Sequence, residues 1–140
     1  AACAAKGLRG SMEDVLVTRD LLAVLDGHNG RECADFVAAR IGSLARLPRE
    51  EWQARFCDLD DAFREQAVPS GCTCCLAALH ESGVVEVANL GDSRAVLIRD
   101  GAVIAETSDH RPSADAERQR IERCGGTVEA ESGRLQGVGV

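Results

Sequence analysis

The spacing of hydrophobic residues changes along the chain, and each change predicts a different element. The run Leu21–Leu25 is continuously apolar, which predicts a buried strand. The run Val15–Val17 predicts a short strand, and the polar residues 18–20 predict a turn that pairs the two runs as a hairpin. After Arg31 the apolar residues recur at helical spacing, so a helix is expected to about Leu47.

A second helical pattern begins at Pro48, a residue that suits the first turn of a helix. Glu50 and Glu51 follow, at the end of the helix whose dipole favours acidic side chains. One apolar stripe runs along this helix at intervals of four, three and four residues, which predicts a face packed in the core rather than a cofactor site. The residues of the stripe are Trp52, Phe56, Leu59 and Phe63.

The second half of the chain is richer in strand signals. Asp100-Gly101 is typical of a two-residue hairpin turn, and strands this close in sequence must pair antiparallel. A further helix is expected from a cap at Ser113 to Cys124, with Gly125-Gly126 as its stop. The expected strands are Thr73–Leu79, Val84–Leu90, Arg94–Ile98 and Ala102–Ala105, followed by a hairpin made of Thr127-Val128 and Arg134–Val138.

This order of strands, two helices, a meander, one helix and further strands predicts an α+β fold in which helices pack on antiparallel sheet. A chain of 140 residues is long enough for one domain with a substantial core. We see no internal repeat and no linker. We therefore expect residues 1–140 to form a single domain.

Composition narrows the class of partner. Hydrophobic residues make up 45% of the chain, which argues against disorder. The net charge is -7 and lysine and arginine form no cluster, so we expect no contact with nucleic acid or anionic membrane, and a divalent cation suits the charge better. No run approaches the roughly 18 apolar residues that a membrane span needs.

Cysteine usage indicates the compartment. The chain has seven cysteines, an odd number, and three of them lie within or beside one apolar run: Cys72, Cys74 and Cys75. Buried free thiols explain this pattern better than a zinc site or a disulfide framework. We therefore expect an intracellular, reducing compartment.

The residues best suited to chemistry follow the buried strand Leu21–Leu25. Asp26 offers a hard oxygen ligand for Mg²⁺ or Mn²⁺, and Gly27 lets the backbone approach a ligand closely. His28 can donate or accept a proton near neutral pH. The alternative is an ordinary Asp-Gly turn beside an incidental histidine.

Further acidic residues sit at strand ends or in loops, at Glu13, Asp14, Asp92 and Asp109. Carboxylates that converge repel one another unless a cation neutralises them, so a converging set would imply a metal. With 23 acidic residues in the chain, however, any one of them can simply be solvated. Arg9 lies four residues before Glu13 and would suit a phosphate clamp. Thr73 alone indicates only a structural role.

Taken together, these stretches resemble the protein phosphatase 2C (PP2C) family of metal-dependent protein serine/threonine phosphatases. The resemblance implies two antiparallel sheets packed face to face and flanked by helical pairs. It covers nearly all of the chain in the family's order. The matching segments are Arg9–Asp14, Val24–Gly30, Ser70–Thr73, Val87–Ala95, Asp109–Pro112, Glu117–Ile121 with Gly125-Gly126, and Arg134–Gly137.

The resemblance also implies a centre of two Mn²⁺ or Mg²⁺ ions that activates a water for attack on phosphoserine or phosphothreonine. Asp26 would bridge both ions, the carbonyl of Gly27 would ligate one, and Glu13 and Asp14 would hold them directly or through water. Arg9 would bind the substrate phosphate, and His28 would protonate the leaving oxygen. Three residues would support this site or hold an accessory ion: Thr73, Asp92 and Asp109.

The sequence departs from the family pattern in several places. Asp115 is the last aspartate, so the family's later DGxxD and D-N motifs are absent and the fold is expected to be incomplete at its C-terminal end. Asn29 replaces a usual glycine, and Cys72 replaces a small hydroxyl residue. Two hypotheses follow. The chain belongs to an active phosphatase of phosphoproteins, or to an inactive relative that serves as a structural or regulatory subunit, with a protein partner covering an open sheet edge.

Overall fold

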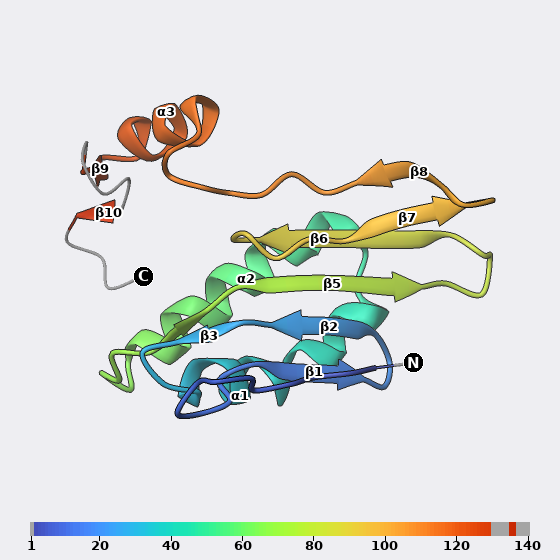
Figure 1. The fold of residues 1–140 in the computed structure, drawn as a ribbon, viewed down its shortest axis with the longest axis horizontal. Coiled ribbons are helices and arrows are strands. Elements are labelled where there is room, and N and C mark those ends of the chain that lie inside the picture. Colours follow the sequence, from blue (N-terminus) through green and yellow to red (C-terminus); the bar gives the residue numbers. More distant parts are fainter. Residues whose placement is uncertain (1, 130–134, 137–140) are drawn as a thin grey trace.

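The computed structural model describes residues 2–129 and 135–136, which form an α+β fold with antiparallel sheets, as predicted (Figure 1). The elements in chain order are β1 (Val15–Thr18), β2 (Leu22–Leu25), β3 (Gly27–His28), α1 (Glu32–Ala38), the 3-10 helix η1 (Ile41–Arg46), α2 (Arg49–Arg64), β4 (Gly71–Cys72), β5 (Cys74–Leu79), β6 (Val85–Leu90), β7 (Val96–Arg99), β8 (Ala102–Glu106), α3 (Asp115–Arg123), β9 (Thr127–Val128) and β10 (Leu135–Gln136).

The central layer is a four-stranded antiparallel sheet in the order β1-β2-β5-β6. The predicted hairpin of β1 and β2 is confirmed, with Val15 opposite Leu25. Strand β5 pairs with β2 although α1, η1 and α2 intervene in the sequence, and these helices lie along one face of the sheet (Figure 1). The long connection therefore places the start of β5 beside the end of β2.

The core lies between this sheet and the helices. The strand predicted to be buried is buried on one face only: in β2, Ala23 and Leu25 are buried while Leu22 and Val24 are exposed, which is the period of two that one covered face produces. The predicted stripe on α2 faces the core, with Phe56 only partly buried. The indole N–H of Trp52 donates to the carbonyl of Leu44 over 3.0 Å, so the largest core side chain keeps its polar group paired. The buried helix residues are Ala34, Val37, Ile41, Leu44, Trp52, Leu59 and Phe63.

The helix expected from Arg31 to Leu47 is instead two pieces, α1 and η1. A bond from the N–H of Arg40 to the carbonyl of Val37 tightens the end of α1 to a three-residue spacing. Ile41 and Leu44, both fully buried, then share one side of η1, because residues three apart eclipse in a 3-10 helix. The prediction of one continuous helix to about Leu47 is therefore wrong at this break.

The expected cap at Ser113 is also wrong: the residue at the start of α3 is Ala114, and its side chain makes no capping bond. The strand expected from Arg94 starts at Val96; just before it, the backbone N–H of Ala95 donates to the hydroxyl of Thr107 and not to a backbone carbonyl. The turn at Asp100-Gly101 is confirmed, since both residues have positive φ, 51° and 77°. The expected hairpin over 127–138 is present as β9 and β10, while residues 130–134, 137 and 138 lie outside the described residues.

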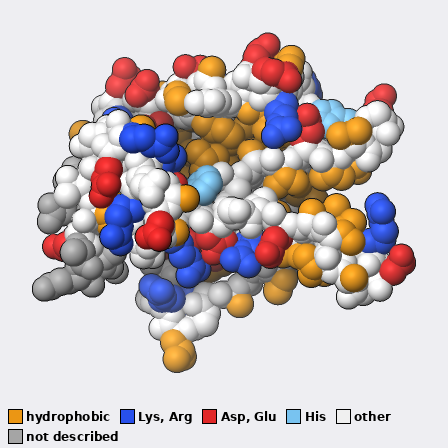
Figure 2. All heavy atoms as spheres, turned by 90° about the horizontal axis from the view of Figure 1, so that it is seen from above, with side chains coloured by type: hydrophobic (Ala, Val, Ile, Leu, Met, Phe, Trp, Pro, Cys, Tyr) orange, Lys and Arg blue, Asp and Glu red, His pale blue; other side chains and the backbone are white. Residues whose placement is uncertain are grey.

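A large apolar surface remains on the outer side of the sheet and on the β7–β8 hairpin, whose residues are all exposed. Figure 2, which views the molecule from the side of β8 and α3, shows hydrophobic side chains gathered in a recess at this edge. Within the described residues, no helix is long and apolar enough to cross a membrane. The exposed apolar residues of this surface include Leu22, Val24, Val87, Val96, Leu97, Ile98, Val103 and Ile104.

Replacing Leu25 by alanine tests the assignment of the core. Leu25 is 0% exposed, so Leu25→Ala should lower the free energy of unfolding by about 2–5 kcal/mol, because it leaves a cavity in the core. The matched control is Leu22→Ala in the same strand, at a residue that is 60% exposed, and it should cost less than about 1 kcal/mol. Urea unfolding followed by tryptophan fluorescence measures both, and equal costs would contradict the assigned faces.

Candidate active site

An acidic hollow of about 710 Å³ lies at the junction of β2 and β3, beside the N-terminal segment 5–14. All six residues predicted to bind metal or act in catalysis line it, although they come from two separate stretches of sequence. The fold therefore brings together Arg9, Glu13, Asp14, Asp26, Gly27 and His28. Their placement in one hollow is an observation; their chemical roles remain predictions.

Asp26 is fixed by its backbone. Its N–H donates to the hydroxyl of Thr73 over 3.1 Å, and its carbonyl accepts from the N–H of Thr73 at 2.9 Å. Thr73 directly precedes β5, so this pair of bonds joins the end of β2 to the start of β5. The hydroxyl of Thr73 also lies 2.7 Å from that of Ser93. Thr73 does not line the hollow; it holds the residue that does.

The carboxyl group of Asp26 is held in an unfavourable electrostatic environment. Its pKa is raised above the usual value, chiefly by partial burial and then by the negative charges of Asp14 and Asp92. A hydrogen bond with the carboxyl group of Asp14 also favours the protonated form. Three carboxyl groups are therefore near enough to interact, and a bound cation would relieve their repulsion.

The oxygen donors in the hollow suit a hard divalent cation, but they are few. In the part of the chain that the structure describes, no group of three or more His, Cys, Asp or Glu side chains converges on one metal position. Asp14 and Asp26, with the nearby carbonyl of Gly27, still fit Mg²⁺, which is commonly held by one or two carboxylates and several waters. Glu13 accepts a bond of 3.1 Å from the hydroxyl of Ser11.

Gly27 is required by close packing of the backbone. A Cβ atom at this position would lie 2.5 Å from the carbonyl oxygen of Glu13, nearer than any side chain is tolerated. The same contact sets the segment that carries Glu13 and Asp14 directly against the strand end. The replacement of glycine by Asn29 is compatible with the turn that follows, because Asn29 has a φ of 56° and asparagine tolerates this left-handed conformation.

The ring of His28 packs against Gly71, its partner across the β3–β4 pair. Any side chain at position 71 would collide with Nε2 of the ring. This nitrogen is buried and has no hydrogen-bond partner among the described residues. A proton passed from His28 to a ligand in the hollow would therefore have to come from Nδ1.

Two cations stand at the rim of this acidic hollow. Arg9 is exposed, and a turn closed by a bond from its N–H to the carbonyl of Lys6 places the two residues together. The sequence argument identified Arg9 but missed Lys6, which is the only lysine in the chain. Because Lys6 lies three residues before Arg9, it could have been considered as a second cation for the same site. Arg31 was also missed, and its guanidinium donates to the carbonyl of Met12 at 3.4 Å, next to the segment that bears the acids.

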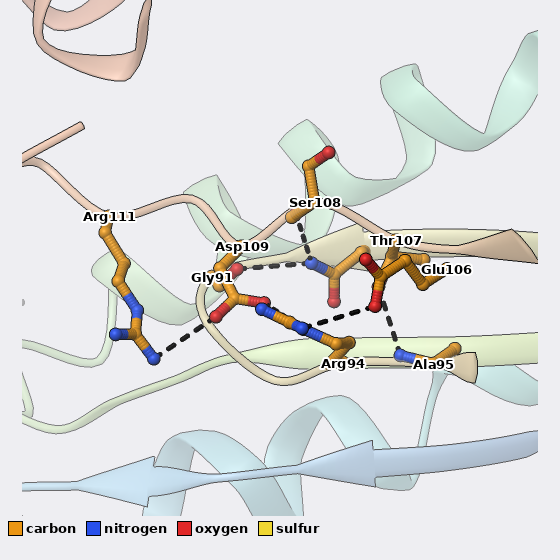
Figure 3. Close-up of polar contacts among 9 residues, drawn as sticks. Gly91, Arg94, Ala95, Glu106, Thr107, Ser108, Asp109 and Arg111 are labelled. Atoms are coloured by element: carbon orange, nitrogen blue, oxygen red, sulfur yellow. Dashed lines mark hydrogen bonds and ion pairs between the residues drawn. The ribbon is translucent and has the colours of Figure 1, made fainter. Parts of the chain in front are cut away.

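Asp109 lies away from the hollow, in an ion-pair network at the base of the β7–β8 hairpin (Figure 3). Its side chain is only 10% exposed and contacts the guanidinium groups of Arg94 at 2.9 Å and Arg111 at 3.2 Å. The hydrogen bond from Arg94 is the main reason that the pKa of Asp109 is lowered. Arg94 also pairs with Glu106 at 3.3 Å. Asp109 thus holds the hairpin in place, whereas Asp92 acts on Asp26 through its charge.

Comparison with known proteins identifies the family. The family model described as "Protein phosphatase 2C" matches residues 3–140. The chain belongs to the protein phosphatase 2C family. It is 37% identical to "Probable protein phosphatase 2C 14" of Arabidopsis thaliana and 36% identical to "Probable protein phosphatase 1N" of Homo sapiens, over 86% and 91% of this chain. It spans only 29% and 35% of the length of these two relatives.

The fold is likewise found among solved structures. A structure described as "Structure of a C.elegans sex determining protein" superposes with a TM-score of 0.76 and 25% sequence identity, covering 96% of this chain and 40% of that one. This likeness supports the α+β architecture and its antiparallel sheets. The resemblance found in the sequence is therefore confirmed at the level of family and fold.

The raised pKa of Asp26 predicts how stability depends on pH without divalent ions. The folded state binds this proton more tightly than the unfolded state, so the contribution is full below the ordinary pKa of 3.8 and is lost as pH rises through the folded value. Asp26→Asn should therefore be more resistant to urea than the wild type at pH 7, and the advantage should disappear below pH 3.8. The exposed Asp58→Asn is the control. An Asp26→Asn chain no more stable than wild type at pH 7 would contradict the assigned repulsion.

Proposed function

We propose that this chain carries part of the active site of a metal-dependent protein phosphatase that hydrolyses phosphoserine or phosphothreonine in phosphoproteins. The observation that carries the proposal is the hollow itself, which gathers Arg9, Asp14, Asp26 and His28 from separate stretches of sequence. Family membership supports hydrolysis of a phosphate ester as the reaction class. The oxygen donors and the repulsion among them support Mn²⁺ or Mg²⁺ as the cofactor.

Asp26 and Asp14 would hold the cation side by side, with the carbonyl of Gly27 as a backbone ligand and Glu13 binding directly or through water. Two such ions, when bound, supply an activated water and offset charge on the phosphoryl oxygens. Asp92 would contribute negative charge for binding an accessory metal ion. Thr73 would keep Asp26 in register, since both of its backbone-directed bonds end on that residue.

Arg9 and Lys6 would receive the phosphate from the open side of the hollow. Arg9 can present two parallel N–H donors to phosphate oxygens, whereas Lys6 adds a point charge. Arg9 and Lys6 on the open side, with the metal held by Asp14 and Asp26, would then orient the phosphorus toward the metal position. His28 would protonate the leaving oxygen through Nδ1, because Nε2 faces Gly71.

A second candidate is an inactive relative acting as a structural or regulatory subunit. The observation that favours it is the exposed apolar surface of β7, β8 and the outer side of the sheet, which a protein partner would cover. The small number of converging metal ligands among the described residues also suits this candidate. The two candidates differ in metal binding and in turnover.

The compartment follows as a lesser proposal. Cys74 and Cys75 are buried as free thiols in the central sheet, where they pack as small apolar residues. We expect such thiols in an intracellular, reducing compartment.

Manganese-dependent hydrolysis of a phosphothreonine peptide tests the first candidate. Turnover should require Mn²⁺ and should fall at least about 100-fold in Asp26→Ala, because the central carboxylate of the metal position is lost. Asp58→Ala on the exposed side of α2 is the matched control and should keep wild-type turnover. Absence of both turnover and calorimetric Mn²⁺ binding in the wild type would favour the subunit candidate.

The role of Arg9 has its own test in the same assay. Arg9→Ala should lower kcat/KM for the phosphopeptide by about 10–100-fold, because a charged hydrogen bond to phosphate is worth about 1.5–3 kcal/mol. Arg9→Lys should recover only part of the loss, since lysine lacks the planar pair of donors. Arg19→Ala, at the exposed β1–β2 turn, serves as the control. An Arg9→Ala enzyme with unchanged kcat/KM would remove Arg9 from phosphate binding.

A further inference from the structure

Two thiols from distant parts of the sequence meet behind the acidic hollow. Sγ of Cys33 lies 3.6 Å from Sγ of Cys72, and both residues are partly accessible to solvent. Cys33 is in the first turn of α1, and Cys72 is in β4. Neither thiol has a part in the proposed hydrolysis, so their contact calls for a separate explanation.

The backbone holds the two sulfurs together. The N–H of Cys33 donates to the hydroxyl of the buried Ser70 over 3.1 Å, which attaches the start of α1 to the residue just before β4. Cys72 is in turn fixed by its pairing with Gly27 across the β3–β4 pair. Both ends of the contact are therefore anchored by the fold, and the sulfurs do not meet through side-chain flexibility alone.

We propose that Cys33 and Cys72 form a peroxide-sensitive dithiol whose disulfide ties α1 to β4. A disulfide has an S–S distance of about 2.05 Å, so the sulfurs need to approach by about 1.5 Å. This proposal does not depend on the proposed hydrolysis. The bond would start from β4, in which Cys72 pairs directly with Gly27 of β3.

The chemistry balances with peroxide as the oxidant. One thiol gives up its proton, and its sulfur attacks a peroxide oxygen; the O–O bond breaks, leaving a sulfenic acid and one water from hydrogen peroxide. The second sulfur then attacks the sulfenic sulfur, the S–O bond breaks, and a second water leaves with the remaining thiol proton. Two thiols lose two electrons and two protons in all, and small-molecule thiols reverse the reaction by exchange.

The other cysteines provide an internal contrast. Cys74 and Cys75 are 5% and 7% exposed, and as neighbours in one strand they point to opposite faces of the sheet. Cys3, Cys57 and Cys124 are exposed, and the structure records no sulfur contact for them within its described residues. Accessibility and a thiol partner therefore coincide only at Cys33 and Cys72.

Peptide mapping of the full chain tests the pairing. The reduced protein is treated with a small excess of hydrogen peroxide, remaining thiols are alkylated, and the tryptic digest is analysed without reduction. Cleavage after arginine yields peptide 32–40 with Cys33 alone and peptide 65–94 with Cys72, Cys74 and Cys75. We expect these peptides to be joined with the loss of two hydrogens, fragment ions that place the link at Cys72, and release by dithiothreitol.

Cys33→Ser and Cys72→Ser should each abolish the link, while Cys57→Ser on the exposed side of α2 should leave it unchanged. Circular dichroism checks that the variants fold, and the wild-type map decides the question if they do not. A link through Cys74 or Cys75, oxidation of Cys33 or Cys72 only to sulfinic acid, or two unreacted thiols would each overturn the proposal.

Discussion

The pair of hydrogen bonds between Asp26 and Thr73 is the constraint on which the candidate site depends. β2 and β5 are adjacent in the sheet but separated in sequence by three helical segments, and these bonds fix the point where both strands open toward the hollow. Because the backbone N–H and carbonyl of Asp26 are both held by Thr73, this residue stays at the sheet end, near the charges of Asp14 and Asp92. The raised pKa of Asp26 is the electrostatic consequence.

The same junction explains why small residues surround the site. Gly27 admits the carbonyl of Glu13, Gly71 admits the ring of His28, and Gly91 admits the side chain of Thr73. Each glycine leaves out a side chain where two separate segments approach each other. Close contacts of backbone and ring thus assemble this end of the sheet.

Much of the fold was predictable because periodicity reports which face is buried. The stripe on α2 identified core residues such as Trp52 directly, whereas the apolar run 21–25 identified a strand but not that Leu22 and Val24 face outward. The break between α1 and η1 was not predictable, since Ile41 and Leu44 fit a three-residue period as well as a longer helix. Strands β3 and β4 were missed because each is only two residues long and begins with glycine, which is depleted in strands.

The site was predictable to a different extent. Short motifs and their resemblance to a family identified the residues of the hollow, but periodicity could not show that Arg9 and His28 meet there. Asp109 carried the same acidic signal as Asp14, yet two arginines neutralise it at the hairpin base. Whether a carboxylate lines the hollow, as Asp14 does, or pairs with arginine, as Asp109 does, depends on contacts between distant parts of the sequence. The residues next to it in the sequence do not carry that information.

Electrostatics and packing lead to one physical picture of the described residues. One face of the sheet is covered by helices and gives the core, while the other face and the β7–β8 hairpin expose apolar side chains. The end of the sheet between these faces carries the carboxylates. A surface that covered the apolar side and extended to the sheet end would exclude water there, and the lower dielectric would strengthen both the repulsion at Asp26 and its attraction for a cation. With such a partner, metal affinity and coverage of the apolar face would be coupled.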